Sequence, residues 1–448
     1  MTEQFSVADA SRTAVRRLLS DRVSVTLGVV FAIVAAGIML RSPERGDWFG
    51  CFVQAAERMQ AGETIHRHET KAYAYPPAMA MLSVPLANLP YRPSLVGFYA
   101  VNMLAAWVAF VAAWRLAGGS PLMQLAPRCR MVLLLTVMLA GRYFIAPLQN
   151  LQFDMIIAAL ILGGALAMLK GRQWSGAVCI GLAAGMKCTP LLFAPYLIWR
   201  RRFAAAVVVV AVAVGINLVP DLLWPQTNGH SYVADWNSQF LSSVATRAPG
   251  DWYSAMQMNQ SVAGALNRWY AVLQNPQRAA AQSADLVGNA ATLLRMTTYG
   301  ACLAMLAVTL WVARRRATPP EKGNETARAQ FAAEIGAVCA LMLLLSPMSS
   351  KAHYVILLLP SLLLVRAAVE RPTAGNVAWL VALAVTGLLT SKGFVGRTAG
   401  DWALVIGMPT FYAATCWVGM LSIIARCSHT TAAAGTAAET PHRLAQAA

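Results

Sequence analysis

Residues 95–116, LVGFYAVNMLAAWVAFVAAWRL, decide the fold class. They hold a single charged side chain, Arg115, and as a helix they are long enough to cross a hydrocarbon core, which takes about 20 residues. Blocks of the same kind recur along the 448-residue chain, of which 58% is hydrophobic and 12% is charged. A soluble domain carries about twice that share of charge. The sequence therefore predicts an all-α polytopic membrane protein and excludes a soluble enzyme, a disordered chain and a collagen-like chain.

The apolar blocks predict about twelve transmembrane helices. We expect them at residues 23–40, 95–116, 131–147, 154–169, 174–187, 190–199, 203–219, 291–313, 331–346, 354–366, 376–391 and 402–425. Basic clusters such as Arg128 with Arg130, and Arg200 to Arg202, then fall on the side of the basic N-terminus. Because Lys and Arg mark the cytoplasmic side of membrane proteins, we expect both termini in the cytoplasm and the protein in a bacterial inner membrane. The net charge of +17 has the same explanation, so we expect no nucleic-acid partner.

In this scheme residues 23–425 form a single transmembrane domain. Residues 1–22 would be a cytoplasmic N-terminal segment, and residues 426–448, rich in Ala and Thr, a disordered cytoplasmic tail. Two long outer loops, at about 41–94 and 220–290, hold most of the Trp, Tyr, Asn, Gln and Asp side chains that are suited to chemistry.

Two short helices are predicted inside the first outer loop. Residues 48–61 place Phe49, Phe52 and Met59 on one helical face, and Gly62 marks the end of that helix. Residues 77–89 are apolar but too short to cross the membrane. Helices of this kind lie along the membrane surface, or, for residues 77–89, re-enter the membrane, and we expect them to shelter a cavity on the outer side.

Asp47 is the first candidate catalytic residue, a few residues beyond the outer end of the first predicted helix. A carboxylate at the membrane boundary, next to aromatic residues, can be partly desolvated and act as a general base. Asp is also a favoured helix N-cap residue, and the two roles are compatible.

Polar and aromatic side chains in two other outer segments could line a sugar site. Tyr73 and Tyr75 precede a Pro-Pro pair; they are ordinary residues of the membrane interface or a wall on which a sugar ring stacks. Gln149, Asn150 and Gln152 lie between two predicted helices. A turn explains Asn150 and the nearby Asp154, whereas a site that hydrogen-bonds sugar hydroxyls would also explain the two Gln residues.

Cations at the outer ends of apolar segments suggest a phosphate site. Lys187 interrupts an apolar hairpin, and a cation inside the membrane is a candidate functional residue, although it can also extend to the interface. Lys351 and His353 follow the end of a predicted helix on the same side. His353 is the second catalytic candidate, as a phosphate or proton-transfer partner, although a lone His is more often structural. Arg268, in the second outer loop, is a further candidate for binding phosphate.

Asn259 and Gln260, in Asn259-Gln260-Ser261, also belong to the second loop. They suit sugar or acceptor binding, and the same tripeptide fits capping of a loop or a glycosylation acceptor. His66 and His68 have no evident third partner, so we expect no metal. The sequence has no P-loop and no dinucleotide-binding fingerprint, and we expect no cofactor.

The order of these motifs along the chain resembles glycosyltransferase family 87, over roughly residues 25–425. The resemblance implies a C-type glycosyltransferase fold, a polyprenyl-phosphate sugar donor used at the extracytoplasmic face, and inversion at the anomeric carbon. It implies that Asp47 is the catalytic base and that His353 matches a histidine of a Ser-Pro-x-Ser-Trp-x-His-His motif. This chain departs from that motif, because Ser350 replaces the Trp and Tyr354 replaces one His.

The expected function is transfer of a hexose, mannose by the resemblance, to a glycolipid or lipoglycan acceptor. Its partners would be the polyprenyl-phosphate donor, that acceptor and membrane lipids. Lys187, Lys351 and Arg268 would stabilise the leaving phosphate. Two alternatives stay open: a membrane transporter, against which the lack of an internal repeat argues, and a ligase or polymerase that uses a pyrophosphate-linked glycan.

Overall fold

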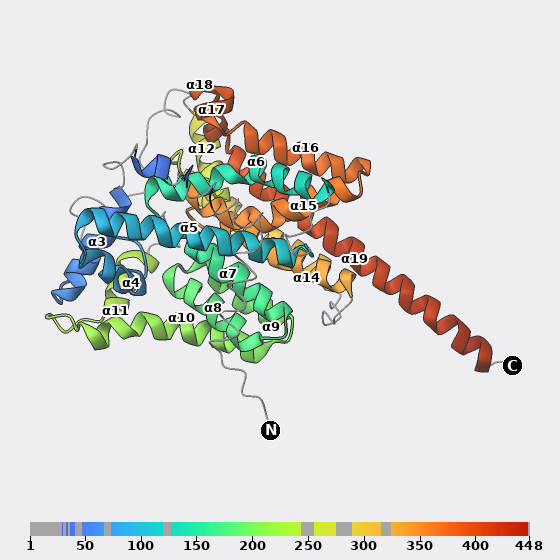
Figure 1. The fold of residues 1–448 in the computed structure, drawn as a ribbon, viewed down its shortest axis with the longest axis horizontal. Coiled ribbons are helices and arrows are strands. Elements are labelled where there is room, and N and C mark those ends of the chain that lie inside the picture. Colours follow the sequence, from blue (N-terminus) through green and yellow to red (C-terminus); the bar gives the residue numbers. More distant parts are fainter. Residues whose placement is uncertain are drawn as a thin grey trace.

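The computed structural model describes residues 29, 33–34, 36–40, 47–66, 73–119, 127–242, 255–274, 289–314 and 324–446, and gives only the backbone of residues 47, 48 and 429–446. Within these ranges every regular element is helical (Figure 1). The predicted N-terminal segment 1–22 and most of the first predicted transmembrane helix, 23–40, lie outside them.

Seven helices of the described chain are long and apolar enough to cross a membrane. They are α5 (Tyr91–Leu116), α6 (Pro127–Asn150), α10 (Phe203–Leu223), α13 (Asn289–Val312), α14 (Glu325–Leu344), η5 with α15 (Lys351–Leu357 and Leu358–Glu370), and α19 (Met408–Gln446). Four predicted spans form shorter helices: α7 (Asp154–Leu169), α8 (Gln173–Met186), η2 with α9 (Thr189–Leu192 and Phe193–Trp199), and α16 (Ala374–Leu388). The all-α polytopic class is confirmed, while the count of twelve spans is met only in part.

The last predicted span, 402–425, is two helices rather than one. Gly407 adopts a left-handed conformation with φ +90° and ends α18 (Arg397–Ile406) before α19 begins at Met408. Such a backbone angle suits glycine because it has no Cβ. The short α17 (Lys392–Val395) precedes α18. The backbone of α19 is helical to Gln446, and the disorder expected for the tail stays a prediction.

Glycines set how closely α7 and α8 pack. A Cβ added to Gly164 would lie 2.8 Å from the carbonyl oxygen of Gly176, so the two backbones touch. Small residues allow such approach between membrane helices. The contact lies about 15 Å from the Asp154 end of α7 and from the Lys187 end of α8, by the rise per residue. It therefore brings Asp154 and Lys187, which occupy those ends, to the same level.

Two short helices cover the end of the bundle near Asp154 (Figure 1). α3 (Asp47–Gln60) ends at Gly62, whose φ is +67°, and α4 (Pro77–Ala87) follows it. Both were expected as helices along the membrane surface. The apolar face of α3 is instead buried in the protein, with Phe52 and Met59 fully covered. Its aromatic side chains thereby become part of the wall behind the candidate site.

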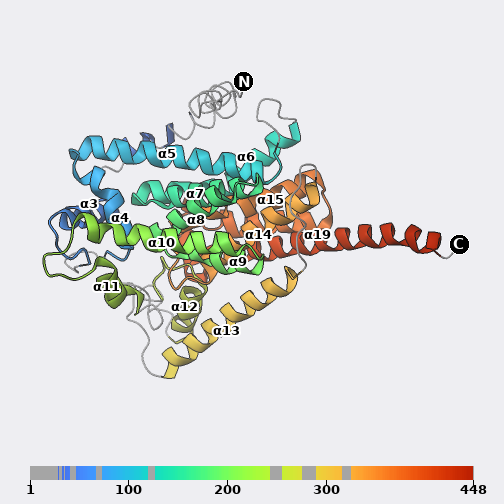
Figure 2. The same ribbon diagram turned by 90° about the horizontal axis from the view of Figure 1, so that it is seen from below.

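α13 lies apart from the main body. It contacts chiefly α12 (Val262–Gln274) and, through a hydrogen bond from the Trp417 indole to Thr309, α19 (Figure 2). α14 is the opposite case, because nearly all of it is buried. Ala and Gly residues along α14 let α19 approach closely, and a Cβ on Gly336 would meet the sulfur of Met420 at 2.8 Å. The α14–α19 contact is therefore part of the buried core, which also takes in residues of α5, α6, α7 and α15.

Candidate active site

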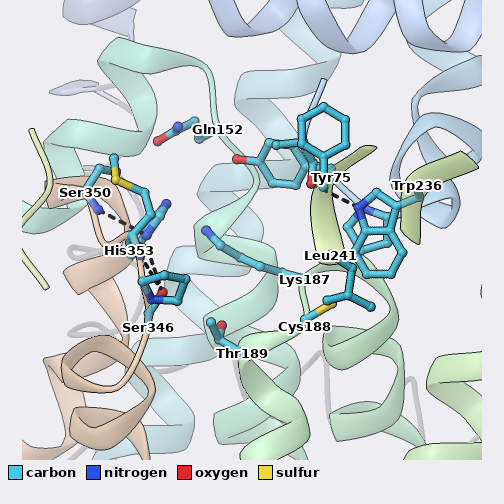
Figure 3. A pocket seen from close by; sticks show the side chains of 15 residues that line it. Tyr75, Gln152, Lys187, Cys188, Thr189, Trp236, Leu241, Ser346, Ser350 and His353 are labelled. Carbon is cyan, nitrogen blue, oxygen red and sulfur yellow. Dashed lines mark hydrogen bonds between the residues drawn. The ribbon is translucent and has the colours of Figure 1, made fainter. Parts of the chain in front are cut away.

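A cavity of about 210 Å³ lies where five distant parts of the chain meet. Its lining side chains include those of Tyr75, Gln152, Lys187, Cys188, Thr189, Trp236, Phe240, Leu241, Ser346, Pro347, Met348, Ser350 and His353 (Figure 3). The polar members come from the loops that end α6 and α8 and from the loop between α14 and η5. The aromatic members come from the segment before α4 and from α11 (Tyr232–Trp236) with η3 (Asn237–Leu241). The cavity is therefore polar on one side and aromatic on the other.

Lys187 forms a buried ion pair beside this cavity. Its Nζ lies 2.7 Å from Oδ1 of Asp154, and both side chains are largely covered. Asp154 is the first residue of α7, where a negative charge also interacts favourably with the helix dipole. An ammonium has three donors, and Asp154 accepts one of them. Lys187 therefore has donors left for an anion that enters the cavity.

His353 faces both this cavity and a smaller one that Asp154 lines. The backbone N–H of Ser350 donates to Nδ1 of His353 over 3.2 Å. A neutral imidazole that accepts at Nδ1 carries its proton on Nε2. His353 is thus held as a hydrogen-bond donor next to the Lys187–Asp154 pair.

Tyr75 and Trp236 form the aromatic side of the cavity. The Trp236 indole donates to the carbonyl of Ala74 over 3.2 Å, which fixes its ring. The Tyr75 ring packs against Phe52, and the Lys187 ammonium lies 5.8 Å from its centroid. Burial raises the pKa of the Tyr75 hydroxyl well above its usual value, so it remains a donor at neutral pH. Such rings suit the C–H faces of a sugar.

Gln152 completes the polar side of the cavity. Its side chain is 3% exposed, and Oε1 has no hydrogen-bond partner among the described residues. A buried amide oxygen without a partner is costly unless a ligand or water supplies a donor. A sugar hydroxyl in the cavity would be such a donor.

Two predicted binding residues brace a loop and do not line the cavity. Asn259 donates to the carbonyl of Pro347 over 3.0 Å and accepts from the backbone N–H of Ser349 over 3.2 Å. Gln260 donates to the carbonyl of Leu404 over 2.9 Å. Asn259 thus holds the loop whose residues Ser346 to Ser350 do reach the cavity.

Arg268 is likewise occupied by backbone rather than placed at the cavity. Its guanidinium donates to the carbonyls of Met256 and Val405 over 3.0 and 3.1 Å, and to that of Asn259. Burial lowers the pKa of Arg268 to about 10, which leaves it charged at neutral pH. Its Nη2 has no hydrogen-bond partner among the described residues, but Arg268 does not line the cavity, so direct binding of the donor phosphate stays a prediction.

Four further predicted residues, Tyr73, Gln149, Asn150 and Lys351, do not line the cavity. Tyr73 is buried behind Tyr75 and donates to the carbonyl of Pro76 over 3.3 Å. Gln149 is exposed and Asn150 is half-buried at the end of α6, and Lys351 is half-buried at the start of η5. The backbone of Asp47 begins α3, but its side chain lies outside the described atoms.

Asp154 and Trp236 are site residues that the sequence analysis did not single out. Asp154 closes the stretch 149–154 and was explained as a turn residue. A signal was present, because the predicted helices 154–169 and 174–187 form an antiparallel hairpin of nearly equal arms. Their outer ends must then meet, and an acid at one end faces a lysine at the other.

No metal site is evident in the described part of the chain, where no group of three His, Cys, Asp or Glu side chains converges. His66 is buried, and its Nδ1 lies 2.9 Å from the carbonyl oxygen of Tyr73. His68 lies outside the described residues.

The model of glycosyltransferase family 87 matches residues 73–347. The chain therefore belongs to this family, as the resemblance predicted, and its C-type glycosyltransferase fold class agrees with the all-helical membrane architecture. The matched range contains Tyr75, Gln152, Asp154 and Lys187, whereas Asp47 lies before it and His353 after it.

Curated relatives include two kinds of mycobacterial enzyme. A polyprenol-phosphate-mannose-dependent alpha-(1-2)-phosphatidylinositol pentamannoside mannosyltransferase of Mycobacterium tuberculosis is 30% identical over 33% of each chain. An alpha-(1->3)-arabinofuranosyltransferase of the same organism is 29% identical over 38% of this chain and 40% of that one. The matches thus span about a third to two fifths of these relatives. A structural comparison matches this chain with the crystal structure of ArnT from Cupriavidus metallidurans bound to undecaprenyl phosphate. The match covers 90% of this chain and 77% of the ArnT chain, at 16% identity and a TM-score of 0.36.

Proposed function

We propose that this protein transfers a sugar from a polyprenyl-phosphate donor to a glycolipid or lipoglycan acceptor at the outer face of the membrane. The observation that carries the proposal is the cavity itself, where the Lys187 ammonium, fixed by Asp154, lies next to Gln152, His353 and an aromatic wall. A cation suits the phosphate of the donor, and aromatic and amide groups suit the sugar. Membership of a glycosyltransferase family supports the enzyme over the transporter.

The reaction needs a base and a stabilised leaving group. The acceptor hydroxyl loses its proton to a carboxylate, and its oxygen attacks the anomeric carbon. The bond from that carbon to the phosphate oxygen breaks, and polyprenyl phosphate leaves with the electron pair. A single displacement from the face opposite the phosphate inverts the anomeric configuration, as in inverting glycosidases.

Each group in the cavity has a defined part in this scheme. Lys187 stabilises the charge that develops on the phosphate, and the N–H at Nε2 of His353 donates to the same oxygens. Asp154 is engaged by Lys187, so it positions the cation. The base is then Asp47, at the start of α3, the helix whose Phe52 packs on Tyr75. Lys351 and Arg268 do not line the cavity, so in this scheme neither side chain contacts the phosphate directly.

Replacing Asp47 with asparagine is expected to reduce sugar transfer by about a hundredfold to ten-thousandfold, the range for loss of a general base. The measurement is transfer of radiolabelled sugar by purified protein in nanodiscs. Polyprenyl-phosphate mannose and polyprenyl-phosphate arabinofuranose are tested as separate donors, because the relatives include a mannosyltransferase and an arabinofuranosyltransferase.

The matched control is Asp401→Asn. Asp401 is a half-exposed acid on α18 that pairs with Lys392 and does not line the cavity. The Asp401→Asn variant should therefore retain full activity. Unchanged transfer by Asp47→Asn would remove Asp47 as the base, and transfer only from a pyrophosphate-linked glycan would replace the proposed donor.

Trp236→Ala is expected to raise the KM for the donor roughly fivefold to tenfold with little change in kcat. Loss of one aromatic contact corresponds to about 1 kcal/mol. Trp269→Ala is the control. The Trp269 indole N–H also donates to a backbone carbonyl, that of Ile406, over 2.8 Å, but the ring stacks on Phe411 away from the cavity. Equal KM values for both variants would mean that the sugar does not rest on Trp236.

A further inference from the structure

Two arginines converge at the end of the bundle opposite the candidate active site. α5 ends there and α14 begins there, whereas α14 ends next to Ser346, which lines the active-site cavity. Arg328 lies at the start of α14, and Arg366 lies near the end of α15. This end also carries the basic clusters from which the sequence predicts the cytoplasmic side.

Gly118, just after α5, is the residue at which the two arginines meet. Its φ is +86°, and a Cβ added there would lie 2.5 Å from Nη2 of Arg328 and 3.0 Å from Nη1 of Arg366. Both guanidinium groups therefore lie against the same residue, and only a residue without a Cβ leaves room for them. We call Arg328 and Arg366 the Gly118 arginine pair.

The two arginines are satisfied to different degrees. Arg366 donates to the carbonyl of Ala117, which caps the end of α5, and its Nε lies 2.7 Å from a carboxylate oxygen of Glu370. We find no hydrogen bond from Arg328 to any described residue, and its ion-pair partner Glu325 is 3.6 Å away and 89% exposed. Such an exposed pair contributes little. A guanidinium has five N–H donors, so Arg328 has donors left for a ligand.

Capping of α5 explains one guanidinium but not two. Arg366 already satisfies the Ala117 carbonyl, so Arg328 is not needed there. Like charges repel each other unless an anion lies between them. Guanidinium nitrogens bind phosphate oxygens at about 2.8 Å, so one phosphate can bridge two guanidinium groups that face the same residue. Arg115, exposed in the last turn of α5, adds a third cation three residues before Gly118.

We propose that the Gly118 arginine pair binds the phosphate of an anionic phospholipid in the leaflet opposite the active site. The pair lies at the ends of α5, α14 and α15, which are all long and apolar enough to cross a membrane, and lipid headgroups lie at the ends of such helices. Basic pockets between transmembrane helices on the cytoplasmic side recognise anionic headgroups. A free phosphate ion offers the same oxygens, but it has no acyl chains to hold it at the membrane surface.

Arg328→Gln tests the charge, because it removes the guanidinium that makes no structural hydrogen bond. In native mass spectrometry of the full chain with phosphatidylglycerol, the first lipid should bind about tenfold more weakly than to the unmodified protein, from the loss of charge-assisted hydrogen bonds. Arg172→Gln is the matched control, because Arg172 is an exposed arginine at the same end of the bundle, just before α8. Its lipid binding should be unchanged. Equal binding by the two variants would overturn the proposal.

Gly118→Ala tests the geometry and keeps both charges. Its Cβ would displace the two guanidinium groups from their common position, and phosphatidylglycerol should again bind about tenfold more weakly. Gly171→Ala is the control, because Gly171 has a φ of +80° and no atom within 4 Å of an added Cβ. It carries the same backbone strain without moving an arginine, and its lipid binding should be unchanged. Full binding by Gly118→Ala would overturn the bridging of one phosphate by the pair.

Competition identifies the source of the phosphate. Phosphatidylglycerol should stay bound in an excess of inorganic phosphate, and phosphatidylcholine, whose headgroup has no net charge, should not replace it. Displacement by inorganic phosphate would assign the site to the free ion, and equal binding of phosphatidylcholine would remove the preference for an anionic lipid. Either result overturns the proposal. These measurements involve no sugar transfer, so their outcome is independent of the proposed function.

Discussion

Replacing Lys187 with methionine is expected to reduce sugar transfer by about a thousandfold, the upper range for removing one donor that stabilises developing charge. Methionine keeps the unbranched stem of lysine and removes the ammonium that faces the cavity. The measurement is single-turnover transfer from a polyprenyl-phosphate sugar at saturating acceptor. Lys392→Met is the matched control, because Lys392 also pairs with an acid, Asp401, but is 45% exposed and lies outside the cavity.

Stability must be separated from catalysis in this experiment, because Lys187→Met leaves the buried Asp154 carboxylate without its partner. Removal of one member of a buried ion pair typically costs about 3–5 kcal/mol. The double variant Lys187→Met with Asp154→Asn removes both charges and is expected to recover the thermal transition while staying inactive. Transfer restored in the double variant would contradict a role of Lys187 at the phosphate.

Asp154 and Lys187 show what the sequence could and could not give. Lys187 was predicted because a lysine in an apolar segment has no local explanation. Asp154 was missed because a local explanation was available: an acid after a turn, at a helix start, is common. Only the touching backbones at Gly164 and Gly176, which align the two helix ends, make the pair evident.

Asn259, Gln260 and Arg268 are the opposite case, because they were predicted at the site and do not line the cavity. Polar residues in a long outer loop suit ligand binding and loop bracing equally well, and the sequence alone does not separate the two. In the structure their side chains satisfy backbone carbonyls near the loop between α14 and η5. A buried loop needs partners for its peptide groups, and these residues supply them. The fold class followed from the length of the apolar blocks, whereas the use of each polar side chain depended on tertiary contacts.

Replacing Glu334 with alanine is expected to lower the free energy of unfolding by about 3–5 kcal/mol, because it leaves the buried Arg200 guanidinium without its carboxylate partner. Glu334 on α14 pairs with Arg200 at the end of α9, and accepts a hydrogen bond from the Tyr196 hydroxyl over 2.9 Å. Both charged side chains are at most 8% exposed. Thermal unfolding in detergent measures the effect. Glu370→Ala is the control, since Glu370 pairs with Arg366 at the surface, where such pairs contribute about 0–1 kcal/mol.

The position of this pair predicts how activity should respond. α9 continues the hairpin that carries Lys187 and Thr189, and α14 leads into the loop of Ser346 and Pro347. The Arg200–Glu334 pair therefore links the two segments that form opposite walls of the cavity, and it does so away from the cavity itself. The double variant Arg200→Met with Glu334→Gln removes both charges, so no buried charge is left unpaired. The Gln side chain still offers an acceptor for the Tyr196 hydroxyl. The double variant should recover most of the lost stability and transfer sugar at nearly the unmodified rate. If the double variant is stable but inactive, the pair acts on catalysis directly, and its role as a tie between α9 and α14 is wrong.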